Sequence, residues 1–340
     1  MYSKRNIIEL DKTESSPRKI CKIETFEKNI DSDTHIASLM KLYPICDEPT
    51  YLEKQNPHIL DISIRFVEDT HTYFVNFDND GIESNYSSDG ILSTSGVVHK
   101  YFDEFNPDIA IEKMRNGRKW NRENKYYNMS NCEIKQMWVT NGEMASANGT
   151  WLHGQLERYM NGIQFNDDII GLIPIKQFNK WYDRFFKDIL IPFRTEFRFR
   201  SGSDLKLTGT ADLIAIDKNH PPPDECDETL SLHIIDWKFS KAIKMKNPYQ
   251  SGVGCCSSLD DTNYSHYLLQ QNIYKYMMET FYPSWNWNGF KYKHVKVVSM
   301  KLCVFHENHG KEGFIVDLPD CRDIVERMMD DRRKTVSQLH

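Results

Sequence analysis

The stretch that most limits how this chain can fold lies between residues 194 and 239, where three strand-like segments follow one another. The segments RTEFRFR, KLTGTADLIAID and LSLHIIDWKF are rich in β-branched and aromatic residues, and turn-forming residues separate them. Directly before them, residues 172–190 place apolar side chains at helical spacing. This order predicts an α/β (α+β) fold with a central mixed sheet flanked by helices.

The segments before residue 172 predict a hairpin followed by helices. From Asp61 the chain alternates between apolar and polar residues, and Asn79-Asp80-Gly81 then supplies a turn. Ser93-Thr94-Ser95 precedes the apolar run VVHKYF and can cap a helix, and helical patterns recur at 108–115 and 131–162.

Downstream of the three strands, residues 267–282 and 321–338 predict helices and residues 294–306 a strand. Between the third strand and the helix predicted at 267–282, residues 244–263 show neither helical nor strand periodicity, which is typical of a mobile functional loop or of a disordered insertion. We therefore divide the chain into a polar, partly disordered tail (1–55) with a short helix near residues 35–42, an N-terminal hairpin and helical lobe (56–145), and a core (146–340).

Bulk properties exclude several classes of protein. No run of ~18 to 20 apolar residues is present, so we expect a soluble, intracellular protein with no membrane partner. The eight cysteines include no C-x-x-C pair, which favours free thiols over a disulfide framework or a zinc finger. The 43 Lys and Arg residues against 49 Asp and Glu give a net charge of −6, so a nucleic acid would have to bind at a local basic face. The oligomeric state stays open.

The residues that point most directly to chemistry lie in two neighbouring strands. Asp236 and Lys238 are two apart, so they project from the same face of a strand, and Trp237 points the other way. Asp212 lies in the preceding strand, GTADLIAI, where the small Gly209 permits close approach of backbone or ligand. Two carboxylates on neighbouring strands can bind one Mg²⁺, and a nearby ammonium can orient an attacking water.

Two helical segments add polar pairs at i, i+4 spacing. GTWLHGQLERY places His153 and Glu157 one turn apart on a common face, where both can point at one metal ion. LLQQNIYKY does the same for Gln270 and Tyr274, which could face the phosphate or the metal-bound water.

In this order the motifs resemble those of the PD-(D/E)xK nuclease superfamily, specifically its RecB-like branch, which includes phage, large-DNA-virus and mitochondrial genome maintenance exonucleases. Asp212 matches the first aspartate, Asp236-Trp237-Lys238 the (D/E)-x-K, residues 149–157 the helical histidine and glutamate motif, and residues 270–274 the Q-x3-Y. The similarity covers about residues 90–305, and Ala211 replaces the proline of the family name. It implies a restriction-endonuclease-like core.

The resemblance also implies roles for these residues. His153, Asp212 and Asp236 would bind Mg²⁺ or Mn²⁺, and Glu157 would do so directly or through water. Lys238 would orient water or stabilise charge, and Gln270 and Tyr274 would position the lysine or the substrate. Glu196 also falls where many relatives have a glutamate. Some members carry an iron-sulfur cluster, but the cysteine spacing here does not fit one, so we expect none.

Simpler interpretations exist for each feature. Asp236 and Lys238 could form only a structural ion pair. His153 could be a hydrogen-bonded helix histidine, Glu157 the partner of an arginine such as Arg158 or Arg194, and the Gln270 and Tyr274 pair the polar edge of a packing helix.

One basic stretch is a candidate surface for nucleic acid. It contains Lys113, Arg115, Arg118, Lys119, Arg122 and Lys125, with aromatic residues between them that could stack on bases. A solvated helix face is the alternative.

We therefore expect a Mg²⁺- or Mn²⁺-dependent deoxyribonuclease, an exonuclease acting in DNA replication, recombination or repair. The alternatives are a catalytically inactive nucleic-acid-binding protein on the same fold and an RNA endonuclease.

Overall fold

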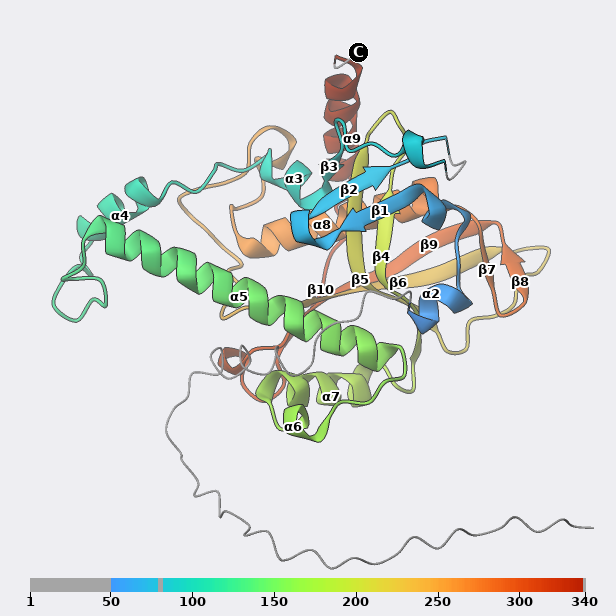
Figure 1. The fold of residues 1–340 in the computed structure, drawn as a ribbon, viewed down its shortest axis with the longest axis horizontal. Coiled ribbons are helices and arrows are strands. Elements are labelled where there is room, and N and C mark those ends of the chain that lie inside the picture. The colour runs from blue at the N-terminus through green and yellow to red at the C-terminus, as the bar shows by residue number, and fades with distance from the viewer. Residues whose placement is uncertain (1–49, 79–81, 339–340) are drawn as a thin grey trace, which may run out of the picture.

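The computed structural model describes residues 50–78 and 82–338 as a mixed α+β fold built on one six-stranded sheet (Figure 1). The strands run in the order β10-β9-β6-β5-β3, and β4 pairs with the other edge of β5. β6 and β9 are parallel, as are β3 and β5, and the other pairs are antiparallel. The sheet consists of β3 (Leu92–Ser93), β4 (Leu190–Arg200), β5 (Leu207–Asp217), β6 (Thr229–Lys238), β9 (His294–Val304) and β10 (Phe314–Asp317).

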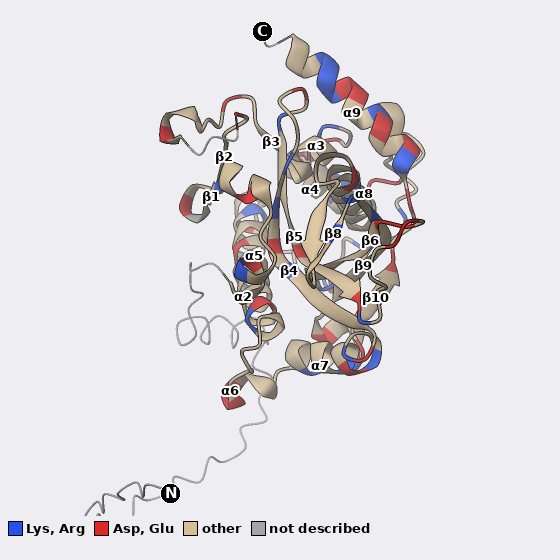
Figure 2. Ribbon diagram, turned by 90° about the vertical axis from the view of Figure 1, so that its right-hand side faces the viewer, with Lys and Arg blue, Asp and Glu red and all other residues tan. Residues whose placement is uncertain are grey.

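Helices cover both faces of the sheet and form two apolar clusters. β5 contributes Ile214 and Ile216 to one cluster and Leu213 and Ala215 to the other, which explains why its sequence is almost continuously apolar. The first cluster includes residues from α3 (Thr94–His99), α8 (Asn263–Phe281) and α9 (Arg322–Ser337), and the second from α5 (Asn131–Met160), α6 (Asp167–Ile170) and α7 (Ile173–Phe185). Figure 2 shows the sheet between these layers.

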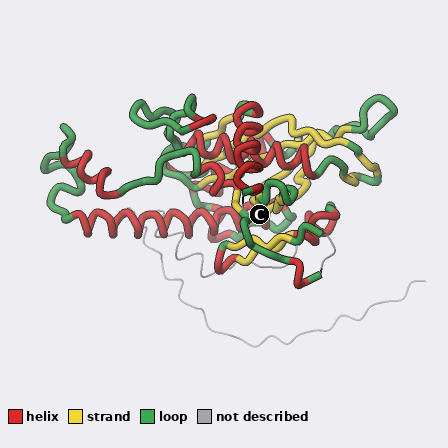
Figure 3. The backbone as a smooth tube through the Cα atoms, turned by 90° about the horizontal axis from the view of Figure 1, so that it is seen from above, coloured by secondary structure: helices red, strands yellow, loops and turns green. Residues whose placement is uncertain are grey.

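The helix α5 is 30 residues long, and its first half extends beyond the sheet together with α4 (Pro107–Arg115) (Figures 1 and 3). Ser130 and Glu133 form a reciprocal capping box at its start, which fixes where the helix begins. Within the described parts of the chain, no helix combines the length and the apolar character needed to cross a membrane.

The N-terminal hairpin turns earlier than the sequence predicts. Its strands are β1 (Ile64–Val67) and β2 (Thr72–Val75), and the chain reverses through a 3-10 turn and His71, which has a positive φ of 49°. The predicted turn at 79–81 and the predicted helix near residues 35–42 lie outside the described residues. α2 (Tyr51–Gln55) lies in the segment assigned to the tail, and its Leu52 is buried. Short 3-10 turns occur at Ile59–Ser63, Glu68–Thr70, Glu83–Asn85, Gly254–Cys256 and Glu307–His309.

The sequence analysis missed one small hairpin. β7 (Trp285–Trp287) and β8 (Phe290–Tyr292) are joined by Asn288 and Gly289, whose φ angles are 51° and 80°. Two positive φ values are the requirement of a type I′ turn, for which Asn-Gly is the preferred pair. The signal was therefore present in the sequence.

Residues 244–262 lack regular structure apart from one 3-10 turn and an isolated bridge between Ser251 and Asp260, and Asn263 begins α8. The segment is nevertheless tied down, because the Lys244 N–H donates to Asn263 Oδ1 and the Asn247 N–H donates to Asp260 Oδ2. It joins β6 to α8 and so borders the residues described next.

Candidate active site

The candidate active site lies where β5 and β6 separate. The two strands pair only over residues 213–216 of β5. Immediately beyond that ladder, the Trp237 backbone N–H donates to Asp212 Oδ2 at 2.7 Å. A backbone N–H of β6 that does not pair with the β5 backbone thus donates to a carboxylate, and His153 from α5 and Tyr267 from α8 also lie close to this point.

Asp236 and Lys238 share one face of β6, and Trp237 packs in the apolar cluster on the other. Lys238 Nζ lies 2.5 Å from Asp236 Oδ2 and 4.0 Å from Asp212 Oδ2. The ammonium also lies 5.3 Å from the ring centroid of Tyr267 on α8. One cation is therefore held between two carboxylates and an aromatic ring.

α5 and β4 complete the cluster from other directions. His153 Nδ1 lies 3.5 Å from Asp212 Oδ1. The ligand atoms of His153, Asp212 and Glu196 all lie within 4.8 Å of one another. Glu196 reaches this position with a positive φ of 43° in the middle of β4, a conformation that costs a non-glycine residue about 1 to 2 kcal/mol. Such strain is often found at functional sites.

Burial and charge set the protonation of the two aspartates differently. Burial raises the pKa of Asp212, but the nearby charges of His153 and Lys238 and the hydrogen bonds from His153 and Trp237 outweigh it, so the pKa falls below its ordinary value. Burial, reinforced by the charge of Asp212, raises the pKa of Asp236 to about 6 despite Lys238. Asp212 is consequently the more strongly anionic of the two.

Lys238 stays protonated at neutral pH. Burial lowers its pKa, but the charges of Asp236 and Asp212 more than compensate, and the pKa lies above its ordinary value. Its side chain is 19% exposed and that of His153 is 25% exposed, whereas that of Asp236 is only 2% exposed. A substrate would therefore reach Lys238 and His153 before Asp236.

Glu157 lies one helical turn from His153 but is not part of the group formed by His153, Glu196 and Asp212. Burial raises the pKa of Glu157 to about 7; the charge of Arg198 and a hydrogen bond with Thr195 oppose this shift, and the charges of Glu53 and Asp212 reinforce it. Its neighbours thus come from β4 and α2, but Glu157 also feels the charge of Asp212, and its role as a metal ligand, directly or through water, stays a prediction.

On α8, the glutamine that contacts the acidic residues is Gln271, one position after the predicted Gln270. Gln270 Nε2 donates to the hydroxyl of Tyr274 at 2.9 Å, so these two residues bind each other. The neighbouring Gln271 is completely buried and donates from Nε2 to Asp236 Oδ1 at 2.7 Å. Sequence reasoning missed Gln271 and Tyr267. The doubled glutamine at 270–271 was the only hint, because spacing alone does not fix the rotation of the helix.

Tyr274 packs against the start of β5. Its ring stacks on Phe199 with centroids 5.3 Å apart, and it fills the space beside Gly209. A Cβ at position 209 would lie 2.6 Å from Tyr274 Cε1 and 2.0 Å from Thr94 Oγ1. The close approach expected at Gly209 is therefore made by protein side chains.

The donor set suits a divalent cation. The two carboxylates are ligand types of both Mg²⁺ and Mn²⁺, and the imidazole nitrogen is a better ligand for Mn²⁺ than for Mg²⁺. Asp236 lies close enough to feel the charges of Asp212 and His153. The ligand atoms are already close enough to bind a single ion. The residues present therefore fit a metal, without specifying which one.

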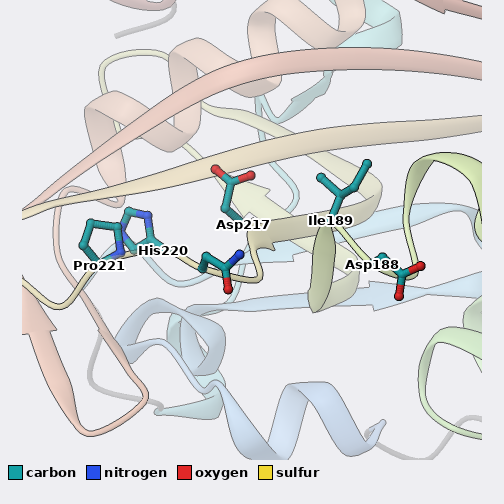
Figure 4. Close-up of a pocket in the computed structure, with 6 residues that line it drawn as sticks. Asp188, Ile189, Asp217, His220 and Pro221 are labelled. Atoms are coloured by element: carbon teal, nitrogen blue, oxygen red, sulfur yellow. The ribbon is translucent and has the colours of Figure 1, made fainter.

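Two other regions lie away from this cluster. The predicted nucleic-acid residues Arg115, Arg118, Lys119, Arg122 and Lys125 are exposed at the end of α4 and in the segment that joins it to α5. A surface hollow at the end of β5 is lined by Asp188, Ile189, Asp217, Asn219, His220 and Pro221 (Figure 4). Neither region touches the carboxylates described above.

Comparison with known proteins leaves the family undetermined. No family model matches this chain, and no curated protein matches it.

Proposed function

We propose that this protein is a metal-dependent nuclease that hydrolyses phosphodiester bonds of DNA. One observation carries the proposal: the carboxylates of Asp212 and Asp236, on two adjacent strands, both lie within 4.0 Å of the Lys238 ammonium, and His153 lies beside Asp212. His153 and Asp212 are far from the D-x-K motif in the sequence, and a merely structural ion pair would not require the partly exposed histidine or the strained glutamate beside it.

The sheet also supports a restriction-endonuclease-like core of the PD-(D/E)xK type. The histidine helix α5, the first aspartate on β5, the D-x-K strand β6 and the glutamine helix α8 follow one another in the order expected of the RecB-like branch. An exonuclease acting in DNA replication, recombination or repair is the corresponding activity.

His153, Glu196 and Asp212 would hold the cation, with Asp236 adjacent. A bound divalent ion would supply positive charge to the scissile phosphate. Lys238, fixed by Asp236, would orient the attacking water and stabilise the charge that develops on the phosphate oxygens. Gln271 would keep the Asp236 carboxylate turned toward Lys238 through its hydrogen bond to the other oxygen.

The direct test is a gel assay on end-labelled single- and double-stranded DNA with Mg²⁺, Mn²⁺ or EDTA. We expect cleavage with either metal, none with EDTA, and loss of cleavage in Asp236→Ala and in Lys238→Ala. Lys180→Ala, which alters a surface lysine on α7 paired with Glu312, is the matched control and should keep full activity. Circular dichroism would verify that each variant folds, and full activity in either folded site variant ends the proposal.

Two further measurements address the alternatives. A calorimetric titration with Mn²⁺ should show binding that Asp212→Asn abolishes, and its absence would favour an inactive nucleic-acid-binding protein. Matched RNA strands in the cleavage assay should remain intact, and preferential cutting of RNA would favour the RNA endonuclease.

A further inference from the structure

The arm formed by α4 and the first half of α5 ends in a concentrated positive charge. Residues 113–127, named here the basic tip, contain six Lys and Arg residues and one acidic residue, in a chain whose net charge is −6. The tip therefore opposes the charge of the rest of the molecule. A polyanion would be attracted to it and repelled elsewhere.

Four of these cations are exposed. In the part of the chain that the structure describes, no salt bridge involves Arg118, Lys119, Arg122 or Lys125, although Lys125 Nζ lies 4.7 Å from the centroid of the Tyr126 ring. Two other cations of the arm are engaged by the protein itself: Lys135 pairs with Asp108, and Arg115 donates to the Met129 carbonyl.

The aromatic residues of the basic tip hold the tip together. Trp120 lies between the Arg115 guanidinium and Tyr127, at centroid distances of 5.1 and 5.9 Å. The Tyr126 hydroxyl accepts from Trp138 Nε1 on α5 at 2.9 Å. Trp120 and Tyr126 are partly buried in these contacts and Tyr127 is 38% exposed, so the tip presents more exposed charge than free ring surface. It therefore suits contact with phosphates more than stacking on unpaired bases, which favours a duplex over a single strand.

The length of α5 sets the distance between the tip and the candidate active site. The tip lies beside the start of α5, because Arg115 donates to the carbonyl of Met129, two residues before the helix begins at Asn131, and His153 lies 22 residues further along the same helix. At a rise of ~1.5 Å per residue this separation is ~33 Å. With ~3.4 Å per base pair, it corresponds to about ten base pairs of duplex DNA.

We propose that the basic tip binds the phosphate backbone of duplex DNA about one helical turn away from the bond to be cleaved. This inference rests on the proposed nuclease function for the position of that bond, but the binding itself does not require cleavage. The tip would make substrates longer than about ten base pairs bind more tightly and react faster than shorter ones.

The binding test uses the full chain in EDTA with a fluorescein-labelled 30-base-pair duplex and fluorescence anisotropy. The tip variant is Arg118→Ala, Lys119→Ala, Arg122→Ala and Lys125→Ala combined. The matched control combines Lys218→Ala, Lys291→Ala, Lys296→Ala and Lys311→Ala, four exposed lysines outside the arm. We expect the tip variant to bind at least about tenfold more weakly than the control, with a slope of log Kd against log salt reduced by about 3.

The spacing test measures kcat/KM for duplexes of 6 to 30 base pairs with Mn²⁺. Wild type and control should gain activity as the length passes about ten base pairs, and the tip variant should lose this gain while matching them on the shortest duplex. Equal binding of the 30-mer by tip variant and control overturns the proposal, as does a length gain that survives in the tip variant. Tip-dependent binding of an RNA duplex but not of the DNA duplex overturns the choice of DNA.

The two proposals fail separately. If the chain binds DNA through the tip but does not cleave it, the tip proposal stands for binding and the nuclease proposal fails. If the chain cleaves DNA and the tip variant behaves like the control, the nuclease proposal stands and the tip proposal fails.

Discussion

β5 carries two aspartate–histidine pairs five residues apart, and their separations are almost the same. Asp212 Oδ1 lies 3.5 Å from His153 Nδ1, and Asp217 Oδ2 lies 3.3 Å from His233 Nε2. The surroundings differ, because the Asp212 side chain is 8% exposed and that of Asp217 is 45% exposed. Asp217 belongs to the open hollow of Figure 4, whereas Asp212 lies where the strands separate.

The comparison shows that an aspartate–histidine pair alone does not mark a candidate site. Burial of the aspartate, together with further charged partners around it, distinguishes Asp212 from Asp217. Water screens the Asp217 pair, so that pair contributes little beyond a surface contact. Asp212 has lost most of its water and is compensated by His153, Lys238 and a backbone N–H. A carboxylate with several convergent partners and little solvent is the arrangement that can bind a cation tightly.

The largest expected effect separates the two aspartates directly. Asp212→Asn should reduce DNA cleavage on the order of a thousandfold, because it removes a buried anionic ligand and part of the charge that fixes Lys238. Asp217→Asn should leave cleavage within about twofold of wild type. Initial rates with Mn²⁺ measure both, and comparable losses in the two variants would contradict the distinction.

The third carboxylate, Glu157, tests how much the burial of an acidic group costs when fewer positive charges offset it. The pKa of Glu157 is raised to about 7, above the ordinary 4.5, so the folded protein binds this proton more tightly than the unfolded chain. Below pH 4.5 Glu157 is protonated in both states, and the folded protein keeps its full stability. As the pH rises from 4.5 through 7, the cost of ionising the buried carboxyl lowers the free energy of unfolding. Glu157→Gln should be about 2 to 3 kcal/mol more stable than wild type at pH 8 and equal to it at pH 4.

Urea denaturation in EDTA at several pH values between 4 and 8 measures this difference without interference from bound metal. A difference between Glu157→Gln and wild type that does not change with pH would show that packing, not ionisation, is responsible.

The smallest expected effect compares the two histidines. His153→Ala should weaken Mn²⁺ binding about tenfold and Mg²⁺ binding less, because imidazole nitrogen is a better ligand for Mn²⁺. His233→Ala should change neither. Isothermal titration with each metal gives the four affinities, and equal losses for Mn²⁺ and Mg²⁺ in His153→Ala would argue against direct coordination.

Local periodicity predicted the parts of the site that depend on one element. The two-residue period of a strand placed Asp236 and Lys238 together, and the i, i+4 rule placed His153 and Glu157 on one side of α5. The sequence could not show that β4 would supply Thr195 and Arg198 beside Glu157, because that contact depends on how helix and sheet pack.

Other features depended on rotation, register or strain. A helix rotated by one residue exchanges Gln270 for Gln271, and no local pattern distinguishes the two. The extent of the β5–β6 ladder, which ends at Leu213 and leaves Asp212 just beyond it, is a tertiary property. The main sheet strands and long helices were predicted from their patterns, whereas the hairpin turn at His71 competed with a stronger turn signal nearby.

The backbone conformation of Glu196 has a consequence for anyone who engineers this chain. A glycine at that position would adopt the same positive φ without steric strain, but this gain would be offset by the entropy cost of a glycine within a strand, about 0.5 to 1 kcal/mol. The same replacement would delete one of three side chains grouped for a cation. Stability would then change little while the proposed metal affinity falls, so a screen for heat tolerance alone would let the cation-binding group be lost unnoticed.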